Sequence, residues 1–278
     1  MESDAPPAAE AEPEREEKKE SWWGTVRFLL LLFLAALVIR SFIVAPFNIP
    51  SRSMLPRLWI GDYLFVSKWS YGYSRYSIPF SPIGFRGRLL GALPARGDVV
   101  VFRHPAGRGE DLVKRVIGLP GDVIEVRQGA VVLNGRPLPR QRIADFALPV
   151  SPNSPCGGPA ARQVPDGNGG TLCLIPRFRE TLPDGTGYAV LDHVVNGEAD
   201  TFGPVTVPDG NIFVMGDNRD ESLDSRFPTS AGGVGMLPLD NVLGRVAITF
   251  WSTDGSAVWL KPWTWFSAAR WDRIGETG

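Results

Sequence analysis

The chain has 278 residues, enough for one large or two modest domains, and its 29 Lys and Arg nearly balance its 30 Asp and Glu, so net charge indicates no class of partner. Its 31 glycines and 25 prolines favour a turn-rich domain of strands over a helical one. Cys156 and Cys173 are the only cysteines. They could form one disulfide in an exported domain or stay free thiols, and we favour the bridge because two ligands are too few for structural zinc.

The N-terminal region changes character at Ser21. Residues 1–20 are acidic, rich in Ala and Pro and without periodicity, which is typical of a disordered tail. Phe28–Ile39 is then an unbroken apolar run. A membrane span needs about 20 residues, so the span has to include flanking residues, and we place it at residues 21–45.

Three interpretations of this apolar segment compete: a buried core helix, a cleaved signal peptide and an uncleaved anchor. Tandem Trp22-Trp23 is typical of a membrane interface and disfavours a core helix. Residues 40–46 contain no good small-x-small cleavage site. We therefore predict a single-pass anchor. Four basic residues on its N-terminal side predict a cytoplasmic N-terminus and an extracytoplasmic domain after about residue 45: Arg15, Lys18, Lys19 and Arg27.

The rest of the chain reads as short strands separated by turns. The predicted strands are residues 63–67, 97–102, 112–117, 122–126, 130–133, 212–215 and 242–251. Asn134-Gly135 predicts a tight hairpin. Residues from about 150 to 204 are loop-rich and suggest an inserted subdomain or a hairpin extension. Aromatic residues near the C-terminus are expected either in the core, as a cover over it, or at a lipid interface: Trp259, Trp263, Trp265, Phe266 and Trp271.

Two candidate nucleophiles, Ser51 and Ser53, lie in the stretch Phe47–Pro56 directly after the apolar segment. A serine hydroxyl is a weak nucleophile until a neighbouring base takes its proton. Histidine is the usual base, and the chain has only His104 and His193. Both are interpreted more simply as surface or turn residues.

Lysine can act as the base when burial disfavours its ammonium form and lowers its pKa. The candidates beyond the anchor are Lys68, Lys114 and Lys261. Lys114 lies in an apolar strand segment, on the face opposite Val113 and Arg115. An ordinary exposed strand lysine is the alternative interpretation. The other two lysines border aromatic residues and lack a comparable apolar frame.

A polar cluster, Gly216–Arg226, follows the predicted strand at residues 212–215. It is either a solvated loop or a set of groups that hold a neutral lysine amine in place through hydrogen bonds. With these motifs, the chain resembles the bacterial type I signal peptidases, membrane-bound serine proteases that remove signal peptides.

Five motifs, in order behind an anchor, carry the resemblance over most of residues 40–126 and 205–250. Ile49–Pro56 resembles the nucleophile box, Gly61-Asp62 and Gly97–Phe102 resemble the following strands, Lys114–Asp122 resembles the lysine box, and Gly216–Arg226 matches the last box almost letter for letter.

The resemblance implies a mostly β fold of coiled antiparallel sheets with an N-terminal transmembrane helix. We divide the chain into a disordered cytoplasmic tail (1–20), an anchor (21–45), a catalytic core (46–126 and 205–278) and an inserted subdomain rich in strands and loops (127–204). The implied location is the bacterial inner membrane, with a periplasmic catalytic domain. Signal peptides of exported preproteins and membrane lipid are the expected partners, and no nucleic acid, metal or cofactor is expected.

Carried over residue by residue, the resemblance implies that Ser53 is the nucleophile and Lys114 the general base. Ser51 and the Ser53 N–H are the implied oxyanion hole, and Ser222 is implied to orient the lysine. The implied substrate pockets admit small residues at −1 and −3 and are lined by Phe47, Ile49, Pro50, Leu58 and Val113. Supporting ion pairs are implied for Arg115, Asp217, Asp224 and Arg226.

Two alternative functions compete with this interpretation. A self-cleaving repressor-type protease shares the Ser-Lys pair but needs a DNA-binding domain, which residues 1–45 do not supply. A membrane-anchored binding or assembly module that kept the fold without peptidase activity is the alternative from another class. The intact Ser53, Lys114 and Ser222 argue against it.

Overall fold

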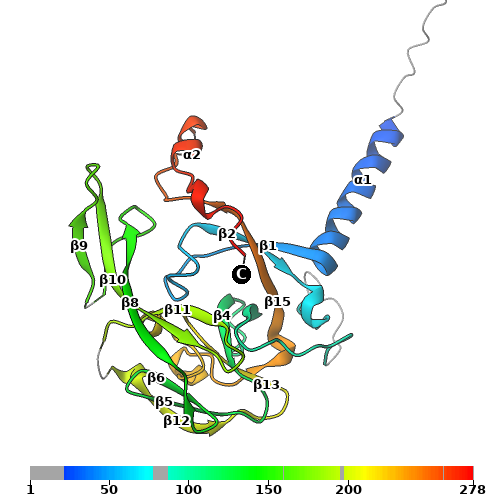
Figure 1. Cartoon of the computed structure of the whole chain (residues 1–278). Helices are drawn as coiled ribbons and strands as arrows, with labels where there is room; N and C mark the ends of the chain where they lie inside the picture. Colours follow the sequence, from blue (N-terminus) through cyan, green and yellow to red (C-terminus); the bar gives the residue numbers. More distant parts are fainter. Residues whose placement is uncertain (1–21, 78–86, 159, 195–196, 259, 278) are drawn as a thin grey trace, which may run out of the picture. The chain divides into compact units, whose positions relative to one another are not determined.

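The computed structural model describes residues 22–77, 87–158, 160–194, 197–258 and 260–277 (Figure 1). The predicted tail at residues 1–20 lies outside the described residues, and so does Trp259. The chain forms two units, residues 1–38 and 39–278. Each unit is described by itself.

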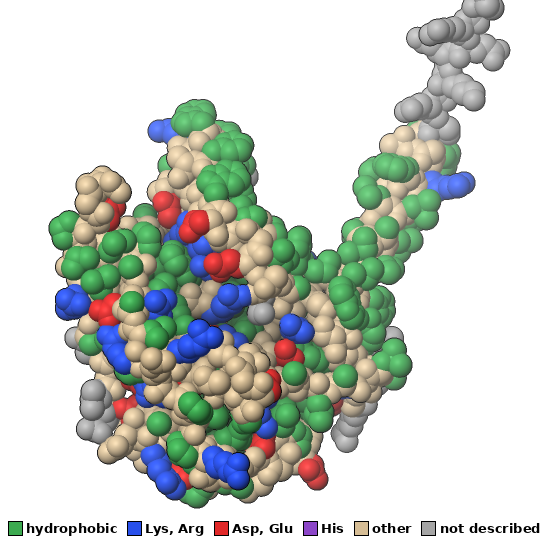
Figure 2. Space-filling view, in the orientation of Figure 1, with side chains coloured by type: hydrophobic (Ala, Val, Ile, Leu, Met, Phe, Trp, Pro, Cys, Tyr) green, Lys and Arg blue, Asp and Glu red, His purple; other side chains and the backbone are tan. Residues whose placement is uncertain are grey.

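The N-terminal unit contains a single described helix, α1 (Trp22–Val38), with no buried residue. Leu and Ala favour helix, and a helix satisfies its own backbone hydrogen bonds, as a lipid environment requires. With the π-helical turn Ile39–Ile43, the helical segment spans 22 residues and is long and apolar enough to cross a membrane. Figure 2 shows mostly apolar side chains along the visible face of α1. The predicted N-terminal apolar helix is confirmed.

A seven-stranded antiparallel sheet forms the centre of the second unit, in the order β1-β2-β15-β3-β4-β13-β14. Its strands are β1 (Val44–Asn48), β2 (Asp62–Ser67), β3 (Val99–Arg103), β4 (Asp111–Gly118), β13 (Asn211–Met215), β14 (Leu237–Pro238) and β15 (Val242–Ser252). The strand predicted from Gly97 begins only at Val99, because Gly97 has a φ of 93° and belongs to the preceding turn.

Two four-stranded sheets complete the domain. One contains β5 (Val123–Arg127), β6 (Ala130–Leu133), β7 (Arg136–Pro137) and β12 (Thr201–Thr206). The other contains β8 (Arg140–Pro149), β9 (Arg162–Pro165), β10 (Thr171–Thr181) and β11 (Gly187–Leu191). Asn134 and Gly135 have φ values of 51° and 77°, as the predicted tight hairpin requires. The mostly β antiparallel fold class is confirmed.

The long antiparallel pair β8–β10 lies within a stretch whose strands were not located from the sequence (Figure 1). Cys173, within β10 of this pair, forms a disulfide with Cys156. Cys173 belongs to an apolar cluster, here called the disulfide cluster, of Leu55, Phe146, Leu148, Cys173, Ile175 and Leu191. The disulfide thus joins a surface loop to the buried side of β10.

The described C-terminal residues form α2 (Trp263–Ser267) and a short 3₁₀ turn, Trp271–Arg273. Trp263, Phe266 and Trp271 are exposed, so they do not belong to the core; a covering position and the lipid interface stay predictions. Arg273 fixes the segment, because its guanidinium pairs with the buried Asp62 carboxylate of β2 at 2.6 Å.

Candidate active site

Ser53 and Lys114 come together although they are far apart in the sequence. Ser53 lies in the turn-rich segment after β1, and Lys114 lies in β4, paired with Val100 of β3. Lys114 Nζ donates a hydrogen bond to Ser53 Oγ at 2.6 Å. Both are buried, with exposed fractions of 4% for Lys114 and 7% for Ser53. The exposed-strand interpretation of Lys114 is therefore wrong.

Burial of Lys114 lowers its pKa from the ordinary 10.5 to about 8, because the ammonium form loses its hydration. Asp224 and Asp217 partly oppose this shift, whereas Arg226 adds to it. Near neutral pH the site therefore contains a fraction of neutral amine that can accept a proton. Its nearest described hydrogen-bond partner is a serine hydroxyl.

Ser51 contacts the Ser53 side chain, and Asn218 contacts the Ser53 backbone. Ser51 Oγ lies 3.3 Å from Ser53 Oγ. The Asn218 N–H donates to the Ser53 carbonyl at 3.0 Å, and its Nδ2 donates to the Arg52 carbonyl at 3.2 Å. Sequence reasoning placed Asn218 in the polar cluster without a role. In the structure, Asn218 links that cluster to residues 51–58, here called the Ser53 segment.

The four residues with implied ion pairs form two buried pairs. Arg115 donates to both oxygens of Asp217, at 2.7 and 2.6 Å. Arg226 donates to both oxygens of Asp224, each at 2.9 Å. Burial alone would raise the pKa of Asp224, but the Arg226 guanidinium beside this carboxyl holds its pKa below the usual value. The Arg115–Asp217 pair holds the polar cluster against β4, and the Arg226–Asp224 pair lies within the cluster.

Ser222 is buried near Ser53, but among the described residues its Oγ has no hydrogen-bond partner, Lys114 included. Gly216 allows Ser222 and Ser53 to lie close to each other. A Cβ at residue 216 would lie 2.3 Å from Ser222 Oγ and 2.5 Å from the Ser53 carbonyl oxygen, so only glycine fits between them. The lysine-orienting role of Ser222 stays a prediction.

Four of the five residues expected to line the substrate pockets share one apolar cluster. This pocket cluster contains Ile49, Met54, Leu58, Leu64, Val66, Val99, Val101, Leu243 and Val246. Phe47 and Val113 are half-buried and pack against it. Pro50 is exposed and lies outside it. The cluster joins the Ser53 segment to the central sheet.

Two expectations about competing bases are corrected. Lys68 does have a buried environment: burial lowers its pKa to about 8, and its Nζ donates to the Ser77 carbonyl at 2.6 Å. Its partner, not its burial, distinguishes it from Lys114. His104 and His193 are buried rather than on the surface. His193 Nε2 lies 3.1 Å from Asn218 Oδ1.

A further buried ion pair was missed by sequence reasoning. Arg219, in the polar cluster, donates to Glu180 of β10 at 2.9 and 2.5 Å. The Tyr188 hydroxyl of β11 donates to the same carboxylate at 2.8 Å. Glu180 stands among alternating strand residues far from the motifs, so only its charge within a strand could have signalled it.

A cavity of about 730 Å³ opens near β4 on the side of Arg115, and its lining includes neither Ser53 nor Lys114. Trp59, Tyr188 and several arginines line it. This cavity therefore does not mark the serine–lysine pair.

An antiparallel β domain with a buried serine hydrogen-bonded to a lysine of lowered pKa has the features expected of a serine hydrolase. The chain belongs to the signal peptidase family, because the family model described as "Signal peptidase, peptidase S26" matches residues 22–251. The predicted family is confirmed.

Named relatives agree with this membership. Signal peptidase I of Rickettsia typhi (strain ATCC VR-144 / Wilmington) is 34% identical over 248 residues, 82% of this chain and 84% of the relative. That of Rickettsia conorii (strain ATCC VR-613 / Malish 7) is 33% identical over 261 residues, 87% of each chain. A crystal structure of a signal peptidase I from Enterococcus faecalis V583 is 26% identical and covers 56% of this chain and 98% of its own, with a TM-score of 0.30.

Proposed function

We propose that this chain is a membrane-anchored serine endopeptidase that removes signal peptides from exported preproteins, with Ser53 as nucleophile and Lys114 as general base. The observation that carries the proposal is the 2.6 Å contact between Lys114 Nζ and Ser53 Oγ inside a buried site. The lowered pKa of Lys114 supports it, because only a neutral amine can take the serine proton.

Acylation begins when Ser53 Oγ attacks the scissile carbonyl carbon and its proton passes to Lys114 Nζ. The tetrahedral oxyanion then accepts hydrogen bonds from the Ser53 N–H and the Ser51 hydroxyl, which are fixed where the charge develops. When the C–N bond breaks, Lys114 gives its proton to the leaving amine, which becomes the new N-terminus of the mature protein. The signal peptide remains as an ester on Ser53.

Deacylation repeats the sequence with water. The neutral Lys114 amine takes a proton from water as the water oxygen attacks the ester carbonyl, and the same donors hold the second oxyanion. Collapse breaks the ester bond, Lys114 returns its proton to Ser53 Oγ, and the signal peptide leaves with a free carboxylate.

Specificity for small residues at −1 and −3 is supported by the pocket cluster, where Ile49 and Leu58 are buried and Phe47 and Val113 half-buried. The half-buried Phe47 and Val113 offer substrate an apolar surface over this packed core, and we propose that a large side chain there is excluded by overlap. Pro50 is exposed and outside this cluster, and we propose that it contacts substrate at the outer edge of the pockets.

The N-terminal helix supports a place in the bacterial inner membrane. Trp22–Ile43 is long and apolar enough to span a bilayer, and basic residues precede it. We place the N-terminus in the cytoplasm and residues after about 45 in the periplasm, in contact with membrane lipid. A disulfide in the second unit suits that compartment.

The proposal is tested with the full-length protein in detergent and a preprotein substrate. Ser53→Ala and Lys114→Ala are each expected to lower turnover by about 10³-fold or more, because nucleophile and base are lost. Lys68→Met is the matched control, since Lys68 is a buried lysine with a similar pKa whose partner is a carbonyl. Near-normal cleavage by Lys114→Ala would refute the mechanism. No cleavage by the unmodified protein would favour the inactive-module alternative.

A further inference from the structure

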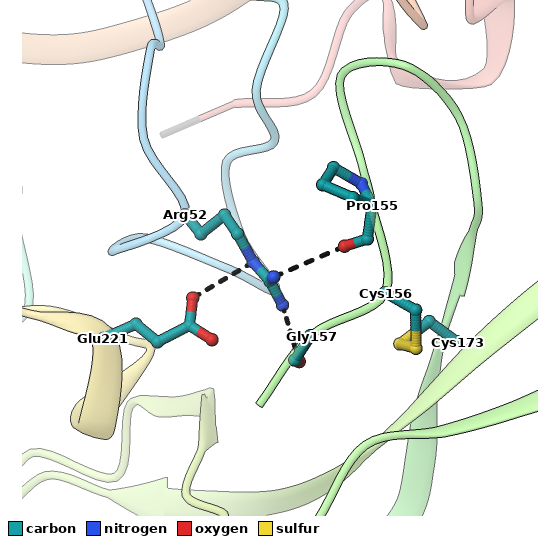
Figure 3. The surroundings of a disulfide bond; sticks show 6 residues. All are labelled: Arg52, Pro155, Cys156, Gly157, Cys173 and Glu221. Carbon is teal, nitrogen blue, oxygen red and sulfur yellow. Dashed lines mark hydrogen bonds and ion pairs between the residues drawn. A yellow bond between two sulfur atoms is a disulfide. The ribbon is translucent and has the colours of Figure 1, made fainter. Parts of the chain in front are cut away.

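Arg52, between Ser51 and Ser53, extends its side chain toward three groups from two other parts of the chain (Figure 3). Its Nε lies 3.0 Å from the Glu221 carboxylate in the polar cluster. Its Nη1 donates to the Pro155 carbonyl at 3.3 Å, and its Nη2 donates to the Gly157 carbonyl at 3.1 Å. The planar guanidinium has donors in a fixed fork, so two hydrogen bonds and one ion-pair contact together restrict its orientation.

The disulfide fixes the loop that receives Arg52. Both acceptor carbonyls flank Cys156, whose sulfur is bonded to Cys173 of β10 (Figure 3). Cys173 is fully buried in the disulfide cluster, and Leu55, just after Ser53, packs in the same cluster. A Cβ at Gly157 would lie 2.8 Å from Arg52 Nη1, so glycine leaves room for the guanidinium.

The Ser53 segment needs such support because residues 51–58 form neither helix nor strand. The Arg52 carbonyl accepts from the Leu55 N–H at 3.0 Å and from Asn218 Nδ2 at 3.2 Å. In the described part of the chain, no hydrogen bond is found for the Ser53 N–H, which leaves it available to an oxyanion. With side chain and carbonyl both held, Arg52 sets the direction of the peptide that carries this N–H.

We infer that Arg52 is a positioning residue: it holds Ser51 and Ser53 in register with Lys114, and the Cys156–Cys173 disulfide acts on the site through Arg52. The inference rests on the proposed function. Arg52 touches none of the proposed reacting atoms with its side chain, so its removal misplaces the nucleophile without removing it.

Kinetics of the full-length protein in detergent test this role. Arg52→Gln is expected to lower kcat roughly 10- to 100-fold with KM within about 3-fold, because a misplacement of about 1 Å has costs of this size. Arg52→Lys, which keeps the charge, is expected to recover part of the loss. Arg57→Gln is the matched control, since the hydrogen bond described for Arg57 is accepted by its backbone carbonyl.

A double-mutant comparison tests the disulfide. Replacing both cysteines by serine is expected to lower kcat in the native background and to cause no further loss when Arg52 is already Gln, because the two changes remove one linkage. An equal loss in both backgrounds would overturn the route through Arg52. Unchanged kcat in Arg52→Gln would overturn the positioning role.

Hydrogen exchange of a peptide covering residues 49–58 gives a readout that does not need cleavage. Exchange is expected to be faster in Arg52→Gln and in the cysteine-free protein than in the native protein and in Arg57→Gln. If the native protein cleaves no preprotein, the proposed function fails, and the exchange data still decide whether Arg52 holds this segment. Equal exchange in Arg52→Gln and native protein overturns the inference.

Discussion

Lys114 shows how one residue can serve chemistry at the expense of stability. In the unfolded chain its ammonium group is hydrated and its pKa is the ordinary 10.5, whereas burial lowers the folded value to about 8. Between these values the unfolded state binds more protons, so this lysine makes folding more favourable as pH rises from about 8 to 10.5. Below pH 8 the burial of Lys114 is most unfavourable, because the buried amine is then mostly protonated. The rest of the fold offsets this cost and holds the amine beside Ser53.

The pH dependence of cleavage follows from the same group. Lys114 is expected to act only when neutral, so kcat/KM should rise about tenfold per pH unit below its pKa and level off above about 8. Initial rates with a preprotein between pH 6 and 10 measure this profile. Lys68→Met should keep the profile, although Lys68 also has a pKa of about 8. A midpoint near 6.5 would instead indicate a histidine as the base.

At the scale of the element, features within one motif can be predicted from the sequence. Contacts between segments that are distant in the sequence cannot. Ser53 and Lys114 are candidate catalytic residues because the motif around each resembles a motif of the family, and strand alternation predicts that Lys114 faces away from Val113. Burial of Lys68 was missed because its environment comes from contacts that no local pattern records. The division between catalytic core and insert stays a prediction; β5 ends at Arg127 and pairs with β6 and β12.

The ion pair Glu180–Arg219 is the clearest example of a contact between distant segments, because it joins β10 to the polar cluster in a buried environment. Glu180→Ala is expected to destabilise the protein by about 3–5 kcal/mol, since it leaves a buried guanidinium without its partner. Urea unfolding of the full-length protein in detergent measures the loss.

The matched control removes both charges. Glu180→Leu with Arg219→Met is expected to restore much of the stability, because no unpaired charge remains buried. If the double variant is as unstable as Glu180→Ala, the unpaired charge is not the cause. Cleavage by the double variant then reports how far this pair also holds the polar cluster around Asn218.

At the scale of the whole molecule, all residues assigned to the site belong to the unit of residues 39–278, and none to the N-terminal unit. The pocket cluster and the disulfide cluster also lie within this unit. The apolar helix therefore contributes no described side chain to the proposed chemistry. We propose that it restricts enzyme and substrate to the same membrane.

Deleting residues 1–38 separates these contributions. The remaining unit has its own core, so it is expected to fold and to cleave a short soluble peptide with kcat close to that of the full chain. Cleavage of a preprotein inserted in vesicles is expected to fall roughly 100-fold at equal enzyme concentration, because the high effective concentration on a shared membrane is lost. Replacing residues 1–38 by an unrelated single span should restore the vesicle rate, since the helix acts as a tether. If only the native helix restores it, the helix takes part in substrate recognition, and the tether account is wrong.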